Sequence, residues 1–204
     1  MSPGVTFERV YHELKRMLAE GELPPGAPIE PALIGKQIAS SITPIRDALH
    51  RLTGERLVEA PNHNGFRAPL PTEAALRDLY RWNGLLLGLA AKQLSPGAGS
   101  EAIGHSITAM NVAASAAAVF LDVARRAGNL ELHVAIGSLN DRLALFRRVE
   151  TAVLDEVPQE LSRLARVSAI GDRTALGHAL ARYHRRRIAV VAGILSYAMH
   201  TAER

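Results

Sequence analysis

Apolar residues near the start of the chain repeat at the spacing of an amphipathic helix. Over residues 6–20 this repeat, which places side chains on one helix face, consists of Phe7, Val10, Tyr11, Leu14, Met17 and Leu18. Gly21 and the cluster Pro24-Pro25-Gly26 interrupt the pattern and are typical of a helix end. The pattern therefore predicts a first helix over residues 6–20.

A helix-turn-helix is predicted to follow. A short helix over about residues 31–39 has Pro31 in its first turn, where proline is favoured. A second helix starts near Thr43, which can cap it, and Pro44 suits its first position. The buried stripe expected for this second helix consists of Ile45, Ala48, Leu49 and Leu52. Two short helices joined by the tight connection 39–42 are the pattern of a helix-turn-helix.

A small hairpin is predicted after these helices. Residues 56–60 are predicted as a short strand, residues 61–65 as a turn and residues 66–68 as the returning strand. A helix-turn-helix followed by such a hairpin makes a winged helix. Pro69 and Pro71 mark a domain boundary, so we predict a winged helix-turn-helix over residues 1–70 and a second domain over residues 71–204.

The second domain is predicted to be entirely helical. Helices are expected near residues 72–94, 100–112, 114–127, 129–152, 156–170 and 172–201. Aromatic residues make up only 4% of the chain, which favours helices packed on helices over a sandwich or barrel. The predicted fold class is mainly α, with an N-terminal winged helix-turn-helix plus a C-terminal all-α helical bundle.

Composition excludes some kinds of chemistry. The chain has no cysteine, which rules out disulfides, thiolate catalysis and zinc–thiolate sites. No basic segment followed by an apolar run opens the chain. The most apolar stretch, residues 107–121, is short for a membrane span and contains Asn111 and Ser115. We therefore interpret this stretch as a buried helix and expect a cytoplasmic protein that has no membrane contact.

Net charge alone says little about the partner. The formal net charge is +4, yet residues 1–70 contain eight lysines or arginines and eight aspartates or glutamates. The basic surplus lies in the C-terminal part, for example in Arg185, Arg186 and Arg187, a short run that we interpret as a solvated face. Binding to nucleic acid would therefore depend on where the charges lie and not on their sum.

The segment ASSITPIRDALHRLTGERLVEAPNHNGF resembles the recognition half of GntR-family transcriptional regulators. The matching residues are Ser41, Thr43, Pro44, Arg46, Ala48, Leu49, Leu57, Val58 and Gly65. The helical remainder resembles the fatty-acid-regulator-type (FCD) C-terminal domain of one subfamily, through Ala127-Gly128-Asn129 and Gly171-Asp172. The resemblance implies a ligand-responsive repressor that acts as a homodimer on a palindromic DNA operator, and no enzymatic activity is expected.

The resemblance also implies which residues contact DNA. Arg46 faces outward because Ile45 and Ala48 take the inner face, and an arginine can donate two parallel hydrogen bonds to guanine. Ser41 and Thr43 suit phosphate oxygens at the start of the helix. Further candidates, two along the helix and four in the wing, are His50, Arg51, His63, Asn64, Gly65 and Arg67.

One position departs from the family pattern. Many members have an arginine where this chain has Ile42. An isoleucine cannot hydrogen-bond a phosphate or a guanine, although it can pack on a thymine methyl group. We therefore expect a changed operator preference and weaker binding than is usual in the family.

A metal site of the FCD type is not expected. In many such domains an aspartate and three histidines bind a metal, which in turn binds a carboxylate effector. The corresponding positions are Ala116, Phe120, a position near Leu161, and Tyr183, which precedes His184. One histidine among apolar side chains cannot hold a divalent ion, so we expect neither a metal nor another cofactor.

The loss of these ligands changes the effector that we expect. Positions that often carry an arginine and a glutamate correspond to Asn83 and Leu87. A less polar pocket disfavours multivalent carboxylates and suits an apolar or amphipathic effector, such as an aromatic compound, a lipid-like molecule or an acyl-CoA. The candidate polar lining residues are Asn83, Asn111, His133, Tyr183 and His184. A domain that only dimerises stays open as an alternative.

Two other classes of protein also stay open. A small helical enzyme with an accessory winged helix would need a nucleophile–base pair or a metal constellation, and the sequence has no evident one. A winged-helix module that binds protein is compatible with the absence of an arginine at Ile42. A steep fall of binding with salt would indicate phosphate contacts and separate DNA binding from protein binding.

Overall fold

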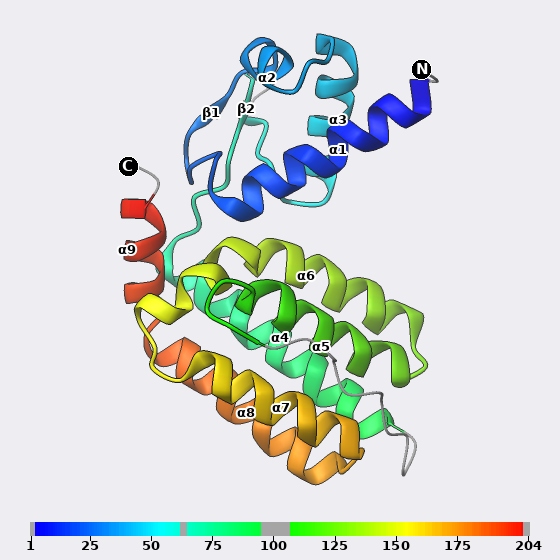
Figure 1. Ribbon diagram of the computed structural model, residues 1–204, viewed down its shortest axis with the longest axis vertical. Helices are drawn as coiled ribbons and strands as arrows, with labels where there is room; N and C mark the ends of the chain where they lie inside the picture. The colour runs from blue at the N-terminus through cyan, green and yellow to red at the C-terminus, as the bar shows by residue number, and fades with distance from the viewer. Residues whose placement is uncertain (1–2, 62–64, 95–106, 202–204) are drawn as a thin grey trace. The chain divides into compact units, whose positions relative to one another are not determined.

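The computed structural model describes residues 3–61, 65–94 and 107–201 (Figure 1). Contacts divide the chain into two units, one formed by Met1–Pro71 with Ala198–Arg204 and the other by Thr72–Tyr197. Each unit has its own cluster of buried apolar side chains. None of the helices in the described ranges combines the length and the apolarity needed to cross a bilayer.

The first unit consists of three helices and a small two-stranded sheet. Helix α1 spans Pro3–Glu20, α2 spans Pro31–Gln37 and α3 spans Ile42–Gly54. Helix α1 packs along α3. The core of this unit includes Val10, Leu14, Met17, Ile45, Leu49 and Leu52. The predicted first helix and the helix-turn-helix are therefore confirmed.

Two backbone positions shape the connection between α2 and α3. Ala39 is in the left-handed conformation, with φ of 50°, and turns the chain without a glycine. Gly35 lies against this turn, because a Cβ atom placed on it would be 2.8 Å from the backbone carbonyl oxygen of Ser40. No larger residue fits at Gly35 unless the turn moves, so Gly35 sets the spacing between α2 and the start of α3.

The wing differs from the prediction. Strand β2 (Phe66–Arg67) pairs antiparallel with β1 (Pro28–Ile29), which was not predicted. The strand expected over residues 56–60 is reduced to a single bridge, in which the backbones of Glu59 and Arg67 exchange two hydrogen bonds of 2.9 Å. Strand β1 was missed because the prolines around it give the segment the composition of a loop.

The second unit is a bundle of helices (Figure 1). Its elements are α4 (Glu73–Gln93), α5 (Val112–Arg126), α6 (Leu130–Val149), the 3₁₀ helix η2 (Glu150–Ala152), α7 (Val157–Ile170), α8 (Arg173–Ala189) and, as far as Tyr197, α9 (Val191–Thr201). Helix α4 packs against α5, α6 and α8, while α7 packs against α5 and α8. The predicted fold class, mainly α with a winged helix-turn-helix and a helical bundle, is confirmed.

Capping side chains explain where several of these helices begin. Thr72, Asn129 and Asp172 precede α4, α6 and α8, and each accepts a hydrogen bond from a backbone N–H group of the following first turn. Gly171 ends α7 in the left-handed conformation, with φ of 77°. These short polar residues and the glycine are the features that allowed the breaks to be predicted.

Two of the predicted helices are wrong in part. Of the helix expected over residues 100–112, residues 100–106 lie outside the described residues and residues 107–111 form a turn, so α5 begins at Val112. The helix expected over residues 172–201 is divided at Val190, whose ψ of 18° with φ of −116° is not helical. Neither proline nor glycine occupies residues 188–192, so no sequence signal marked this division.

Candidate functional site

Helix α3 presents a polar face on the side opposite its buried stripe. Ser41, Thr43, Arg46 and His50 are exposed there, and the apolar Ile42 is 49% exposed. Ser41 is the N-cap residue, and its hydroxyl makes no capping hydrogen bond. Because the first N–H groups of a helix have no intrahelical acceptor, the start of α3 combines free backbone donors with two exposed hydroxyls.

Arg46, unlike Arg51 and Arg67, has no partner among the described residues of the protein. Among the residues that the structure describes, no carboxylate pairs with Arg46 and no acceptor takes a hydrogen bond from it. Its guanidinium therefore keeps all of its N–H donors for a molecule outside the chain. The buried side of the same helix, with Ile45 and Leu49 fully enclosed, fixes the direction in which Arg46 projects.

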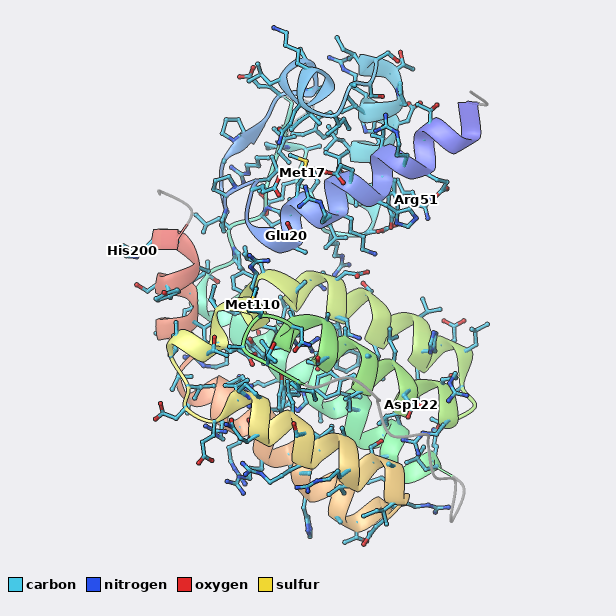
Figure 2. All side chains as sticks on the ribbon, viewed as in Figure 1. Met17, Glu20, Arg51, Met110, Asp122 and His200 are labelled. Atoms are coloured by element: carbon cyan, nitrogen blue, oxygen red, sulfur yellow. The ribbon has the colours of Figure 1, made fainter. Side chains whose placement is uncertain are left out.

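Arg51, a second candidate for DNA contact, is exposed but engaged by side chains of α1 and α3 (Figure 2). Its guanidinium carbon lies 4.1 Å from the centre of the Tyr11 ring on α1. Arg51 also pairs with Glu8 at 3.3 Å and with Glu55 at 3.2 Å, and the Tyr11 hydroxyl donates to Glu55 at 2.7 Å. These contacts assign Arg51 a role in holding α1 against α3.

The wing candidates are only partly described. His63 and Asn64 lie outside the described residues. Gly65 is exposed with φ of 78°, and Arg67 is exposed but pairs with Glu59 at 2.6 Å. The ring of His50 meets the ring of Phe66 edge to face, with centres 5.0 Å apart, so His50 lies where α3 meets the base of the wing.

In the second unit, three of the five predicted polar lining residues come together. Asn83 on α4 and Tyr183 and His184 on α8 are all buried, and His184 Nε2 lies 2.9 Å from Asn83 Oδ1. Asn111 instead accepts a hydrogen bond from the backbone N–H of Thr108 in the turn before α5. His133 lies on α6 about two turns before Asn140. In the described ranges no contact joins His133 to the other candidates.

The residues that complete this buried cluster were missed from the sequence. Arg147 on α6 is fully buried, and it donates to Asn140 Oδ1 at 2.7 Å and to Asn83 Oδ1 at 3.0 Å. Its guanidinium carbon lies 4.9 Å from the centre of the Phe120 ring. The sequence did contain a signal for their burial. Asn140 and Arg147 are seven residues apart, about two helical turns, and both fall on the buried apolar stripe of α6.

A buried ion pair lies beside it. Arg187 on α8 is fully buried and pairs with Glu150 at 3.0 Å and with Glu160. The interpretation of residues 185–187 as a solvated face is therefore wrong for Arg187, while Arg185 is exposed as predicted. The Tyr80 hydroxyl donates to Glu150 at 2.8 Å. Burial and the Glu150 carboxylate together raise the pKa of Tyr183 to about 12, so both tyrosines stay protonated and act as donors.

His184 is neutral at ordinary pH. Burial lowers its pKa to about 3, because the charged ring would lose its hydration, and the guanidinium groups of Arg147 and Arg187 lower the pKa further. The hydrogen bond between Nδ1 and the backbone carbonyl of Leu180, at 2.8 Å, acts in the opposite direction. A carbonyl oxygen can only accept, so the single proton of the neutral ring lies on Nδ1.

The positions that correspond to the metal ligands of FCD-type domains are apolar and enclosed. Ala116, Phe120, Leu161 and Tyr183 are all buried in the core of the second unit. The rings of Phe120 and Tyr183 meet edge to face with centres 5.3 Å apart. In the described parts of the chain no three histidine, aspartate or glutamate side chains lie close enough together to hold a metal ion. The residues present at these four positions therefore do not fit a metal ion.

Sequence relatives match a limited part of the chain. The HTH-type transcriptional repressor GlaR of Escherichia coli (strain K12) is 31% identical over 70 residues, which are 34% of this chain and 32% of GlaR. The HTH-type transcriptional regulator YdhC of Bacillus subtilis (strain 168) is 29% identical over 79 residues, which are 39% of this chain and 35% of YdhC. The match thus spans about a third of the length of each relative.

Two solved structures share the fold over nearly the whole chain. A protein from Rhodococcus sp. RHA1, described as a transcriptional regulator GntR, superposes with a TM-score of 0.69 at 19% identity and covers 92% of this chain and 97% of its own. McbR/YncC of E. coli superposes with a TM-score of 0.64 at 20% identity and the same coverage. The sequence model of the gntR family of bacterial regulatory proteins matches residues 6–68. Residues 6–68 are therefore similar to the DNA-binding part of the GntR family of bacterial regulatory proteins.

Proposed function

We propose that this protein is a sequence-specific DNA-binding transcriptional regulator, a ligand-responsive repressor that acts as a homodimer on a pseudo-palindromic operator. The observation that carries the proposal is the unpartnered, exposed Arg46 on the outer face of α3, inside a GntR-family domain. Solvated arginines are common on helices, but Ser41, Thr43 and His50 are exposed at the same helix, and these side chains suit contacts with phosphates.

Helix α3 enters the major groove in this proposal. Arg46 donates two parallel hydrogen bonds to O6 and N7 of a guanine, the commonest specific arginine contact. Ser41 and Thr43 donate to phosphate oxygens, where the backbone N–H groups of the first turn add their own donors. Ile42 lies next to them and is half exposed, so it packs on a thymine methyl group and shifts the operator preference.

Dimerisation takes place through the second unit. Trp82, Leu85 and Leu89 are exposed on α4 at spacings of three and four residues, so they form one apolar stripe on the helix surface. Large apolar residues grouped in this way mark interaction surfaces. A second copy of the chain is the occupant that we propose, because two identical α3 helices match the two halves of a palindromic site.

The second unit also receives the effector. The buried cluster around Asn83, Tyr183 and His184 joins α4, α6 and α8, so a ligand that binds there would change how these helices pack. A ligand that binds one arrangement of the dimer better than another shifts the population toward it. Such a shift would change the spacing of the two α3 helices and thereby the affinity for the operator.

The test is selection of DNA from a random pool by the purified protein, repeated with Arg46→Ala. We expect a palindromic motif that the wild type enriches and the variant does not. Arg163→Ala removes an exposed arginine of α7 and should enrich the same motif as the wild type. Failure of the wild type to enrich any motif at low salt, with and without the formate described below, would refute the proposal and favour a winged-helix module that binds protein.

A further inference from the structure

Arg147 carries a buried charge that no carboxylate neutralises among the residues that the structure describes. Its hydrogen-bond partners are the neutral amides of Asn83 and Asn140, and its guanidinium lies over the Phe120 ring. Within the described ranges no aspartate or glutamate forms an ion pair with Arg147. A buried cation in this position is costly unless an anion is paired with it.

The two carboxylates buried nearby are already taken. Glu150 and Glu160 both pair with Arg187, and Glu160 also pairs with Arg186 at 2.9 Å. The Tyr80 hydroxyl donates to Glu150 as well. Glu150 and Glu160 are therefore both engaged by Arg187, and Glu160 by Arg186 as well, and neither carboxylate forms an ion pair with Arg147.

Hydrogen-bond donors also exceed acceptors around Arg147. Arg147 Nε and Asn83 Nδ2 are buried and have no partner. Asn83 Oδ1 faces both Arg147 Nη2 and His184 Nε2, but a neutral His184 with its proton on Nδ1 has none on Nε2 to donate. If the Asn83 amide turns by half a rotation to donate to His184, Arg147 loses that acceptor. Two buried donor groups lack an acceptor in either state.

We propose that Arg147, together with Asn83, binds the carboxylate group of a small monocarboxylate effector in the second unit. The carboxylate supplies the missing negative charge and two coplanar acceptors, which match the parallel N–H donors of Arg147 Nε and Nη2. Phe120 and Tyr183 bound the cluster with aromatic surface, so the rest of the ligand is apolar. This inference rests on the effector-responsive function proposed above, and it adds one negative charge to the apolar effector expected from the sequence.

One uncompensated charge also limits the ligand. A single carboxylate neutralises Arg147, whereas each further carboxylate would be buried without a cation, because Arg187 is already paired with Glu150 and Glu160. Dicarboxylates and tricarboxylates should therefore bind more weakly than monocarboxylates that carry the same number of carbon atoms. Formate, the smallest monocarboxylate, contains the recognised group and nothing else, which makes it a suitable probe.

The experiment measures thermal unfolding of the full-length, DNA-free protein by the fluorescence of Trp82. Trp82 is the only tryptophan in the chain and precedes Asn83 on α4, so it reports on the second unit. Sodium formate replaces sodium chloride at constant ionic strength, and formamide serves as the uncharged analogue. At about ten times its dissociation constant, formate should raise the midpoint by about 5 °C, whereas chloride and formamide should not.

Variants of Arg147 identify the site. Arg147→Met keeps an unbranched side chain against Phe120 but removes the charge, and it should abolish the formate shift. Arg148→Met removes the exposed neighbouring arginine on α6 and should retain the shift. Arg147→Lys keeps a charge without the two parallel donors and should lose the preference for formate over chloride. If Arg147→Met does not fold, Arg147→Lys and the comparison of formate with chloride and formamide on the wild type test whether Arg147 binds the carboxylate.

Two outcomes would overturn the inference. One is a wild-type midpoint that is the same in formate, chloride and formamide, and the other is a formate shift that persists in the folded Arg147 variants. Neither readout involves DNA. A protein that selects an operator but ignores formate would therefore retain the proposed regulator function without this site, and a protein that binds formate but selects no DNA would retain the site alone.

Discussion

Replacing His184 with glutamine should flatten the pH dependence of the stability of the second unit. The folded-state pKa of His184 is lowered to about 3 from an ordinary value of 6.5. Between these two values the unfolded chain binds a proton at His184 that the folded chain does not bind, so stability rises with pH. The contribution of His184 is fully present above the unfolded pKa and is lost as the pH falls toward 3.

The magnitude follows from the size of the pKa difference. At about pH 4.5, two units below the ordinary histidine pKa, the unfolded state gains about 2.7 kcal/mol from protonation of His184, at about 1.36 kcal/mol per unit. The folded state gains almost nothing, because its pKa lies well below that pH. The wild type should therefore lose about 2.7 kcal/mol more than His184→Gln between about pH 7.5 and about pH 4.5.

The assay is urea denaturation followed by Trp82 fluorescence across this pH range. The buffers should contain no carboxylate, since a carboxylate buffer would bind at Arg147 by the inference above. Protonation of aspartates and glutamates affects both proteins alike and cancels in the difference. His178→Gln, on the exposed side of the same helix α8, should keep the wild-type pH dependence. An unchanged pH slope in His184→Gln would refute the assignment of His184 as the buried neutral histidine.

Two further substitutions test the turn and the dimer surface. Gly35→Ala places a Cβ atom 2.8 Å from the Ser40 carbonyl oxygen. It should therefore lower the free energy of unfolding of the first unit by about 1–3 kcal/mol, lower its unfolding midpoint and weaken DNA binding. Circular dichroism measures the midpoint. The control is Gly54→Ala, which should not lower the midpoint because nothing lies within 4 Å of the added atom. Equal effects of the two substitutions would contradict the role of Gly35. Leu85→Asp, in the exposed stripe of α4, should convert a dimer to a monomer in sedimentation equilibrium, whereas Ile170→Asp on α7 should not. A Leu85→Asp protein with the wild-type mass would exclude this stripe as the dimer surface.

Local sequence patterns predicted the helix-turn-helix because each of its parts is specified over a few residues. The spacing of Ile45, Ala48, Leu49 and Leu52 identified the buried side of α3 and therefore the outward direction of Arg46. The exposed position of Arg46 follows from this helical period alone. The helical period does not reveal whether an outward arginine is engaged by other side chains. Only the fold showed that Arg51 is engaged by Tyr11, Glu8 and Glu55.

The wing and the last helix were predicted less well, for a different reason. The partner of β2 is β1, which lies far from it in the sequence and is only two residues long. A pairing of this kind depends on tertiary contacts, since two residues carry no alternating pattern. The division at Val190 likewise has no local marker, and Val191 and Ile194 beyond it are buried by contacts with other parts of the fold.

The sequence by itself determined the fold class, the helix-turn-helix motif that resembles the GntR family and the apolar residues at the expected metal positions. Each of these depends on local period, capping residues or residue identity. Only the tertiary structure decided that Arg147 and Arg187 are buried and that Arg187 engages both Glu150 and Glu160. It also decided that no carboxylate of the described residues pairs with Arg147. An arginine in a helical sequence is ordinarily exposed, and its burial depends on which helices cover it, which is a property of packing and not of any single segment.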